Sequence, residues 1–169
     1  RIAVMSGGQI LQVADTHEIC AQPSHVFVAG FLGSPPMNLL PGKIETTGDG
    51  FLFRAGELRI ALPRWCGNLP RRYYAGASLT LGIRPENMRI SPAEAGDIAG
   101  TVLLTESRGH ESVVTVVSMG QCVKIIVPSE ATPGEGETVG IAIDTDALAF
   151  FDDLSGQRTT ARHDQGAAQ

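Results

Sequence analysis

The sequence has few aromatic and few basic residues, and each shortage excludes a class of protein. Phe, Trp and Tyr make up 5% of the 169 residues, and 13 Lys and Arg stand against 18 Asp and Glu, for a net charge of −5. Binding to nucleic-acid phosphates needs a concentrated basic face, which this balance opposes. No apolar run approaches the roughly 20 residues that a membrane-spanning helix needs. We therefore expect neither a nucleic-acid-binding protein nor a membrane-spanning one.

The cysteines are also scarce: Cys20, Cys66 and Cys122 are odd in number and widely spaced. No Cys-x-x-Cys pair occurs and the four histidines are scattered, so the spacing predicts neither a disulfide framework nor a metal site. Free thiols persist in a reducing compartment, which predicts a cytoplasmic location. The chain begins at Arg1 without a basic-then-apolar leader, so we expect no signal peptide and a fragment of a longer protein.

The first 14 residues predict a β-hairpin. Two apolar runs, 2–5 and 9–13, flank a Gly7-Gly8 pair, and paired glycines accept the positive φ of a tight turn. The stretch Met5–Gln9 resembles the phosphate-binding signature of ABC ATPases, but that site needs a helix behind its glycines. Here a strand pattern follows instead. The sequence also lacks a Walker A motif, GxxxxGK[ST], and a Walker B motif, so we expect no catalysis.

Two short helices are predicted after the hairpin. Asp15 and Glu18 have the spacing of a capping box, and Pro23 ends the helix that they begin. Ser24 is expected to cap the second helix. That helix carries its apolar side chains on one side, at Val26, Phe27, Gly30 and Phe31. A glycine just past the last turn, with proline following, predicts that this helix stops at Gly33.

After Pro36 the apolar residues recur with a period of two, as in β-strands. The strand-like runs are residues 51–54, 58–62, 79–83, 98–105, 112–119, 122–127 and 138–143. Gly-rich turns separate them, so the pattern predicts a small barrel or sandwich. We expect two interleaved sub-barrels over 37–157, with a weak point between them at 91–96. Residues 158–169 have almost no apolar content and are expected to be a disordered tail.

Three blocks of the sequence resemble one family in order and spacing. They are residues 1–13, residues 16–23 with 27–38, and Leu81–Glu86. Together they are similar to the ATPase subunits of maltose-type ABC importers, from the last hairpin of the ATPase domain into the C-terminal regulatory domain. Within that family the chain is most similar to the glycerol-3-phosphate subgroup. The segments that carry this finer resemblance are 37–40, 74–76 and 155–158.

The resemblance implies a mainly β, OB-like regulatory domain, called TOBE, preceded by a β-hairpin and two short helices. Residues 1–36 would be a remnant of the ATPase domain with its linker, and 37–157 the TOBE domain. The implied partners are a second copy, the missing ATPase domain, the membrane-spanning permease subunits and a regulatory protein. The chain would hold no cofactor, since ATP and Mg²⁺ would sit in the missing domain. The location implied is cytoplasmic, on the inner face of the bacterial membrane through the transporter.

The same resemblance marks a set of motif residues with a structural or interface role. They are Gly33, Ser34, Pro35, Asn38, Gly82, Arg84, Pro85 and Glu86. The Arg84-Pro85-Glu86 tripeptide has two readings. One is a turn held by local charge and hydrogen bonds, and the other is a contact between domains or between the copies of a dimer.

Two alternatives remain open from the residues. Trp65, Tyr73 and Tyr74 lie among arginines in a Pro/Gly-containing loop, where they could contact a partner or stack single-stranded nucleic acid. OB-like domains also resemble modules that bind small oxyanions. Candidates for such an anion site are Ser107, Lys124 and Ser129.

Overall fold

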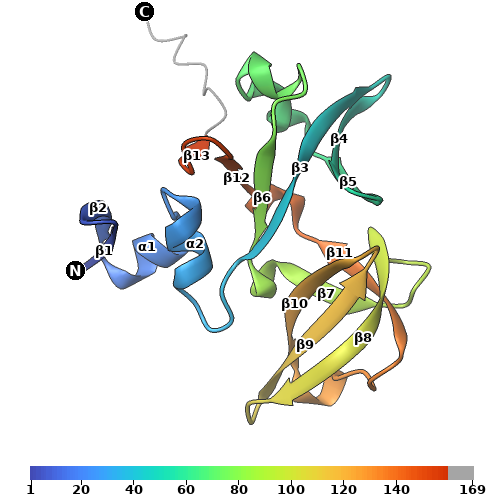
Figure 1. The fold of residues 1–169 in the computed structure, drawn as a ribbon. Coiled ribbons are helices and arrows are strands. Elements are labelled where there is room, and N and C mark those ends of the chain that lie inside the picture. The colour runs from blue at the N-terminus through green and yellow to red at the C-terminus, as the bar shows by residue number, and fades with distance from the viewer. Residues whose placement is uncertain (160–169) are drawn as a thin grey trace, which may run out of the picture.

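The computed structural model describes residues 1–159, which form an N-terminal arm and a two-sheet barrel (Figure 1). The arm is residues 1–36 and the barrel is residues 37–159. The arm consists of β1 (Ile2–Ser6), β2 (Gln9–Ala14), α1 (Thr16–Ala21) and α2 (Val26–Phe31). It stands to one side of the barrel, with its hairpin farthest from the barrel strands.

The arm begins with the predicted hairpin. β1 and β2 pair antiparallel, and the turn between them places Gly7 at φ 56° and Gly8 at φ 78°. Both values lie in the left-handed region that glycine adopts without strain. Gly7 and Gly8 are therefore turn residues, and no helix follows them that could bind a phosphate. The N-cap of α1 is also as predicted, since the Asp15 carboxylate accepts from the Glu18 N–H at 2.8 Å.

The second helix departs from the sequence prediction in its cap. His25 caps it, because its Nδ1 accepts from the Phe27 N–H at 3.0 Å. Ser24 was the expected cap, but it is committed to the hairpin. Its N–H donates to Gln12 Oε1 at 2.8 Å, and its hydroxyl lies 3.3 Å from the Leu11 carbonyl. These bonds fasten the start of α2 to β2.

The expected apolar side of α2 is also wrong. Phe27 and Phe31 are 40% and 66% exposed, and they stack on each other with ring centroids 5.8 Å apart. The residues that the helix buries are Val28 and Ala29. A helix of six residues is short enough that its contacts, rather than its periodicity, decide which side is covered.

The barrel is built from two antiparallel sheets. The first has the order β13-β12-β6-β3-β4-β5 and the second the order β10-β9-β8-β11-β7. The strands of the first sheet are β3 (Asn38–Thr47), β4 (Gly50–Ala55), β5 (Leu58–Leu62), β6 (Leu79–Ile83), β12 (Ala149–Asp152) and β13 (Arg158–Thr159). Those of the second are β7 (Met88–Ser91), β8 (Ile98–Ser107), β9 (Glu111–Ser118), β10 (Gln121–Pro128) and β11 (Thr138–Ile143). Five 3-10 turns connect them: η1 (Arg64–Asn68), η2 (Arg71–Tyr73), η3 (Pro85–Asn87), η4 (Ser129–Ala131) and η5 (Thr145–Ala147).

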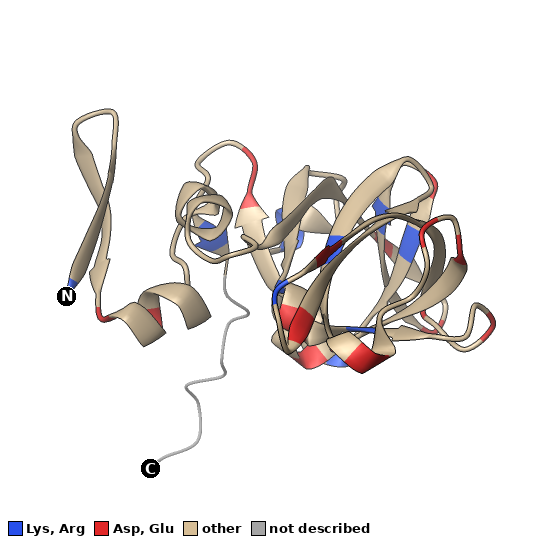
Figure 2. Ribbon diagram, turned by 90° about the horizontal axis from the view of Figure 1, so that it is seen from below, with Lys and Arg blue, Asp and Glu red and all other residues tan. Residues whose placement is uncertain are grey.

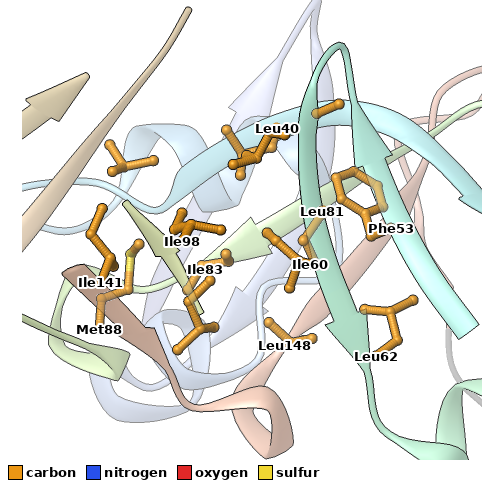
Figure 3. Close-up of a cluster of buried hydrophobic side chains, with 14 of the residues drawn as sticks. Leu40, Phe53, Ile60, Leu62, Leu81, Ile83, Met88, Ile98, Ile141 and Leu148 are labelled. Atoms are coloured by element: carbon orange, nitrogen blue, oxygen red, sulfur yellow. The ribbon is translucent and has the colours of Figure 1, made fainter. Parts of the chain in front are cut away.

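Both sheets contribute to one hydrophobic core. Leu40, Phe53 and Leu81 of the first sheet belong to the same buried cluster as Ile98 and Ile141 of the second (Figure 3). Each fully buried side chain of this size contributes about 1.5–3 kcal/mol relative to an exposed one. The two sheets therefore stabilise each other through a shared interior. The predicted mainly β, OB-like fold is confirmed.

The path of the chain between the sheets differs from the expected one. The chain enters the second sheet at η3, directly after β6, and returns to the first sheet after η5. Residues 91–96 were expected to separate two sub-barrels, but they join β7 to β8 within one sheet. Arg158 and Thr159 pair with β12 rather than starting a disordered tail. The rest of that expected tail lies outside the described residues.

Candidate functional site

The structure assembles most of the motif residues where the arm meets the barrel. The linker between them begins at Gly33, which has φ 113° just after the C-cap of α2. A Cβ placed on Gly33 would lie 2.9 Å from the Pro35 carbonyl oxygen and 3.0 Å from Arg84 Nη1. A side chain at this position is therefore excluded twice, by the backbone conformation and by the approach of Arg84.

Arg84 fastens the arm to the barrel. It is 7% exposed, and its Nη1 donates to the Leu32 carbonyl at 3.0 Å while its Nη2 donates to the Cys20 carbonyl. Cys20 lies in the last turn of α1 and Leu32 is the C-cap of α2. The last carbonyls of a helix lack partners within the helix, and a cation there also meets the negative end of the helix dipole. One side chain thus caps two helices at once.

The Arg84-Pro85-Glu86 tripeptide combines a local turn with a contact to the arm. Within the described residues Arg84 forms no ion pair with Glu86, which is exposed. Pro85 is buried and opens η3, the turn that leads to the second sheet. The tripeptide thus forms a turn, in which the Asn87 N–H donates to the Arg84 carbonyl at 3.0 Å, while the Arg84 side chain contacts the arm.

Asn38 makes a second fastening, at the first residue of β3. Its Nδ2 donates to the Lys124 carbonyl at 2.8 Å, and its Oδ1 accepts from the Lys124 N–H at 2.7 Å. The side-chain amide thereby pairs with a residue of β10 as a backbone amide would. Asn38 is 8% exposed, so these bonds are largely shielded from water. They join the start of the first sheet to the edge strand of the second.

Further contacts hold the linker between these two points. The Arg108 Nη1 donates to the Ser34 carbonyl at 2.7 Å and lies 3.2 Å from the Ser34 hydroxyl. Met37 is buried against Gly82, where an added Cβ would collide with the Met37 sulfur and lie 2.9 Å from a Phe151 ring carbon. Sequence reasoning marked Ser34 and Gly82 but missed Arg108. A loop arginine carries no local pattern that announces a contact 74 residues away.

The end of the barrel also returns to the arm. The Val26 N–H donates to the Gly156 carbonyl at 2.8 Å, and the Arg158 N–H donates to the Ser24 carbonyl at 2.8 Å. His25 and Gln157 form a bridge between these two bonds. The start of α2 is thus tied to the segment between β12 and β13. Together with the contacts that Arg84 and Arg108 make to the arm, this tie forms what we call the clasp.

A cleft of about 1060 Å³ opens between the arm and the barrel at the clasp. Arg84 and Arg158 line it together with His17, Ser24, Glu86 and Asp146. Apolar walls come from Met37 and Leu148, among other residues. The cleft is therefore a mixed polar and apolar site that both parts of the chain contribute to.

The aromatic residues of the Pro/Gly-containing loop pack inward. Tyr73 is fully buried, and its hydroxyl donates to Asp152 Oδ2 at 2.8 Å. The Trp65 ring meets the buried Phe150 ring edge-on at 6.0 Å. Tyr74 packs on Phe51 at 5.1 Å. The proposed partner-contact role is wrong for Tyr73, because a buried ring cannot stack a base or touch a partner.

Asp152 gives this loop a predicted pH dependence. The Ser155 N–H and the Tyr73 hydroxyl donate to the carboxylate and lower its pKa from 3.8 to about 2. Because folding lowers the pKa of Asp152, the ionised carboxylate stabilises the fold at pH values above its pKa in the unfolded chain. This contribution, about 2 kcal/mol, is lost as the pH falls from about 4 toward 2. Urea unfolding at pH 7, 4 and 2 checks this. The stability difference between the native chain and Asp152→Asn should shrink across that window, and parallel pH profiles would contradict it.

The expected anion-site residues do not converge. Ser107 and Ser129 lie at one end of the β8–β9 hairpin, where the Ser129 hydroxyl donates to the Gly109 carbonyl at 2.6 Å. Lys124 lies about 13 Å back along β10, four strand residues before Pro128. Its backbone is bound by Asn38 and its side chain is exposed. No described contact joins these three residues into one site.

Residues 1–159 also bear on metal binding and membrane insertion. No three His, Cys, Asp or Glu side chains in this part of the chain are grouped as metal ligands would be. The two α-helices have six residues each, and no helix in that same range reaches the length and apolar character of a membrane span. The Cys66 thiol is packed in the core, where burial raises its pKa to about 12.

Known proteins match this chain from end to end of the barrel. Residues 33–88 match the family model of the MalK OB fold domain, and residues 81–151 match that of the TOBE domain. The chain is 34% identical over 158 residues to the sn-glycerol-3-phosphate import ATP-binding protein UgpC of Escherichia coli O157:H7. It is 32% identical over 159 residues to the uncharacterised ABC transporter ATP-binding protein YurJ of Bacillus subtilis (strain 168). These matches cover 94% and 90% of the chain.

The chain spans 43% of the length of these two relatives. Among solved structures, the cytoplasmic molybdate-binding protein ModG, with molybdate bound, superposes with a TM-score of 0.55 over 67% of this chain and 94% of ModG. At 16% identity that likeness concerns the fold alone. The chain belongs to the family of MalK-type OB fold and TOBE domains that ABC transporter ATP-binding proteins carry.

Proposed function

We propose that this chain is a non-catalytic regulatory and dimerisation module of the ATP-binding subunit of an ABC importer for a carbohydrate or glycerol-3-phosphate. The observation that carries the proposal is the match to UgpC over 94% of the chain, together with a clasp that fixes the arm to the barrel. A regulatory module must hold a defined position relative to the domain that it controls. The buried Arg84 contacts and the backbone bonds between residues 24–26 and 156–158 supply that fixed position.

The proposal assigns a role to each part of the chain. Residues 1–36 are the end of the ATP-binding domain and its linker, and 37–157 are the TOBE domain. ATP and Mg²⁺ would be held by the ATP-binding domain of the parent protein, so the chain itself holds no cofactor. Its partners are a second copy, that ATP-binding domain, the permease subunits and a regulatory protein. The assembly is cytoplasmic and peripheral to the inner face of the bacterial membrane.

A nucleic-acid partner is not part of the proposal. Lys and Arg positions are interspersed with Asp and Glu positions over the strands (Figure 2). Tyr73, one of the three aromatic candidates, is fully buried. Stacking of single-stranded nucleic acid needs exposed aromatic rings along a basic groove. The proposal therefore takes a protein, rather than nucleic acid, as the partner.

Sedimentation of the purified chain tests the proposed role. We expect a concentration-dependent monomer–dimer equilibrium and no heat of binding when ATP is titrated in a calorimeter. A strict monomer at several hundred micromolar would remove the dimerisation role. Micromolar binding of ATP would overturn the non-catalytic assignment, because a nucleotide site would then lie within these residues.

A second candidate function is the binding of a small oxyanion by the barrel. The fold likeness to ModG, whose structure holds molybdate, favours it. Ser107, Lys124 and Ser129 do not converge in the structure, so of these three candidates only Lys124, which is exposed on β10, is tested as an anion ligand. Molybdate and sulfate should then raise the melting temperature of the chain, and Lys124→Gln should abolish that rise. An unchanged melting temperature with both anions would exclude this candidate.

A further inference from the structure

The cleft at the clasp contains two guanidinium groups that form no ion pair with residues 1–159. Arg84 and Arg158 both line it, and neither has a carboxylate oxygen within 4.0 Å among residues 1–159. The ion pairs that these residues do form lie elsewhere, between Arg54 and Glu45 and between Arg72 and Asp152. Neither arginine of the cleft is therefore paired directly with a carboxylate of residues 1–159, although Glu86 and Asp146 also line the cleft.

Arg84 is the more buried of the two. At 7% exposure, its charge is held mostly away from water, and its described partners are two neutral carbonyls. Buried charges in proteins are normally paired, because removing an ion from water is costly unless an opposite charge replaces the lost hydration. The carbonyls occupy two of the five N–H donors of the guanidinium. The remaining donors are left for another acceptor.

Arg158 approaches the same cleft from the other end of the chain. Its backbone is fixed twice, by its pairing with Phe151 and by its N–H bond to Ser24. Its side chain is half-buried and makes no hydrogen bond or ion pair within the described residues. Burial lowers the pKa of this guanidinium. Such a lowering reflects a cation that lacks water and lacks a nearby negative charge.

We propose that this cleft binds a small phosphate-type oxyanion, inorganic phosphate or a phosphomonoester, between Arg84 and Arg158. Guanidinium groups match the oxygens of a phosphate with paired, parallel hydrogen bonds, which lysine cannot do. The His17 side chain lines the same cleft and can add a donor, whereas the Ser24 hydroxyl, which also lines it, is already bonded to β2. Glu86 and Asp146 line it as well, so the site favours a ligand small enough to stay at the arginines.

The site differs from the oxyanion candidate discussed above, because it uses neither Lys124 nor the β8–β9 hairpin. It also goes beyond the proposed dimerisation role. Arg84 and Arg158 both belong to the barrel, and the Arg84 guanidinium also holds the ends of both arm helices. An anion between the two arginines would therefore fix Arg84 to the last strand through a contact that the chain alone lacks. Its occupation would then strengthen the clasp.

Titration of the chain with inorganic phosphate at constant ionic strength tests the proposal. Amide NMR shifts should saturate, and they should centre on residues around Arg84, Arg158 and Ser24. The Arg158→Gln variant should weaken binding tenfold or more, and Arg158→Lys should weaken it several-fold because it keeps the charge but loses the paired donors. Arg59→Gln is the matched control, since Arg59 is exposed on β5 and does not line the cleft. It should bind within twofold of the native chain.

Three outcomes would overturn the proposal. Shifts that never saturate would indicate an adventitious ion only, and equal losses in Arg59→Gln and Arg158→Gln would indicate general charge screening. Loss of binding in Lys124→Gln with Arg158→Gln unchanged would place the anion at the second candidate site instead. A parallel titration with methyl phosphate separates the two ligand sources, since tighter binding of the ester points to a phosphomonoester. Sedimentation of the same variants reports on the dimerisation role independently.

Discussion

Replacing Arg84 with alanine is expected to lower the free energy of unfolding by roughly 3 kcal/mol and to release the arm from the barrel. Each hydrogen bond from a charged donor contributes about 1.5–3 kcal/mol, and the substitution removes one bond at the end of each helix. The Cys20 and Leu32 carbonyls would then lack a protein partner. Because α1 and α2 have only six residues each, they depend on such contacts to stay folded.

Urea unfolding and limited proteolysis measure these two effects. Protease cleavage of Arg84→Ala should move into residues 15–36 while the barrel stays intact. Arg89→Ala is the matched control, because Arg89 is exposed on β7 and a change there should cost less than about 0.5 kcal/mol. If Arg84→Ala kept both the stability and the cleavage pattern of the native chain, Arg84 would not hold the arm.

Replacing Asn38 with alanine is expected to cost about 3 kcal/mol and to loosen the two sheets from each other. The change removes both side-chain bonds to Lys124 and leaves its N–H and carbonyl without a partner. An unsatisfied buried polar group costs about 1–3 kcal/mol. Amide hydrogen exchange should therefore accelerate most at Lys124 and its neighbours in β10.

The asparagine at the end of η1 provides the control for this experiment. Asn68 is exposed and makes no described side-chain hydrogen bond, so Asn68→Ala should leave the unfolding midpoint nearly unchanged. Asn38→Asp adds a second test, because it keeps the acceptor for the Lys124 N–H but loses the donor to the Lys124 carbonyl. At pH 7 it also places a largely buried carboxylate oxygen against that carbonyl, so its stability should be no higher than that of Asn38→Ala. Equal stability of all variants would mean that water replaces the amide at no cost.

The strands were predictable wherever alternation was undisturbed, as in Leu58–Leu62 and Leu79–Ile83. β3 was missed although it is the longest strand of the first sheet, because Pro41 and Gly42 interrupt its alternation. Its partner changes near those residues, from β6 to β4. The break in the pattern therefore marks a change of neighbour, which the local sequence does not reveal.

The candidate site was predictable as a set of motif residues but not as a set of contacts. Arg84 and Asn38 could be marked in advance, whereas their partners are backbone groups 52 to 86 residues away. Backbone carbonyls carry no sequence signal, so the clasp could not be foreseen. Tyr73 was misread for the opposite reason. A tyrosine among arginines suggests an exposed surface, but its hydroxyl is satisfied by Asp152 inside the fold.

The tie between Ser24–Val26 and Gly156–Arg158 has a kinetic consequence. Those backbone bonds close a loop of about 130 residues, which includes nearly the whole barrel. The entropy cost of such a closure grows with loop length and is offset only after the intervening strands are in place. The arm is therefore expected to dock last as the chain folds. While the last strand is still being synthesised, the start of α2 would lack residues 156–158, the segment that it bonds to in the folded protein.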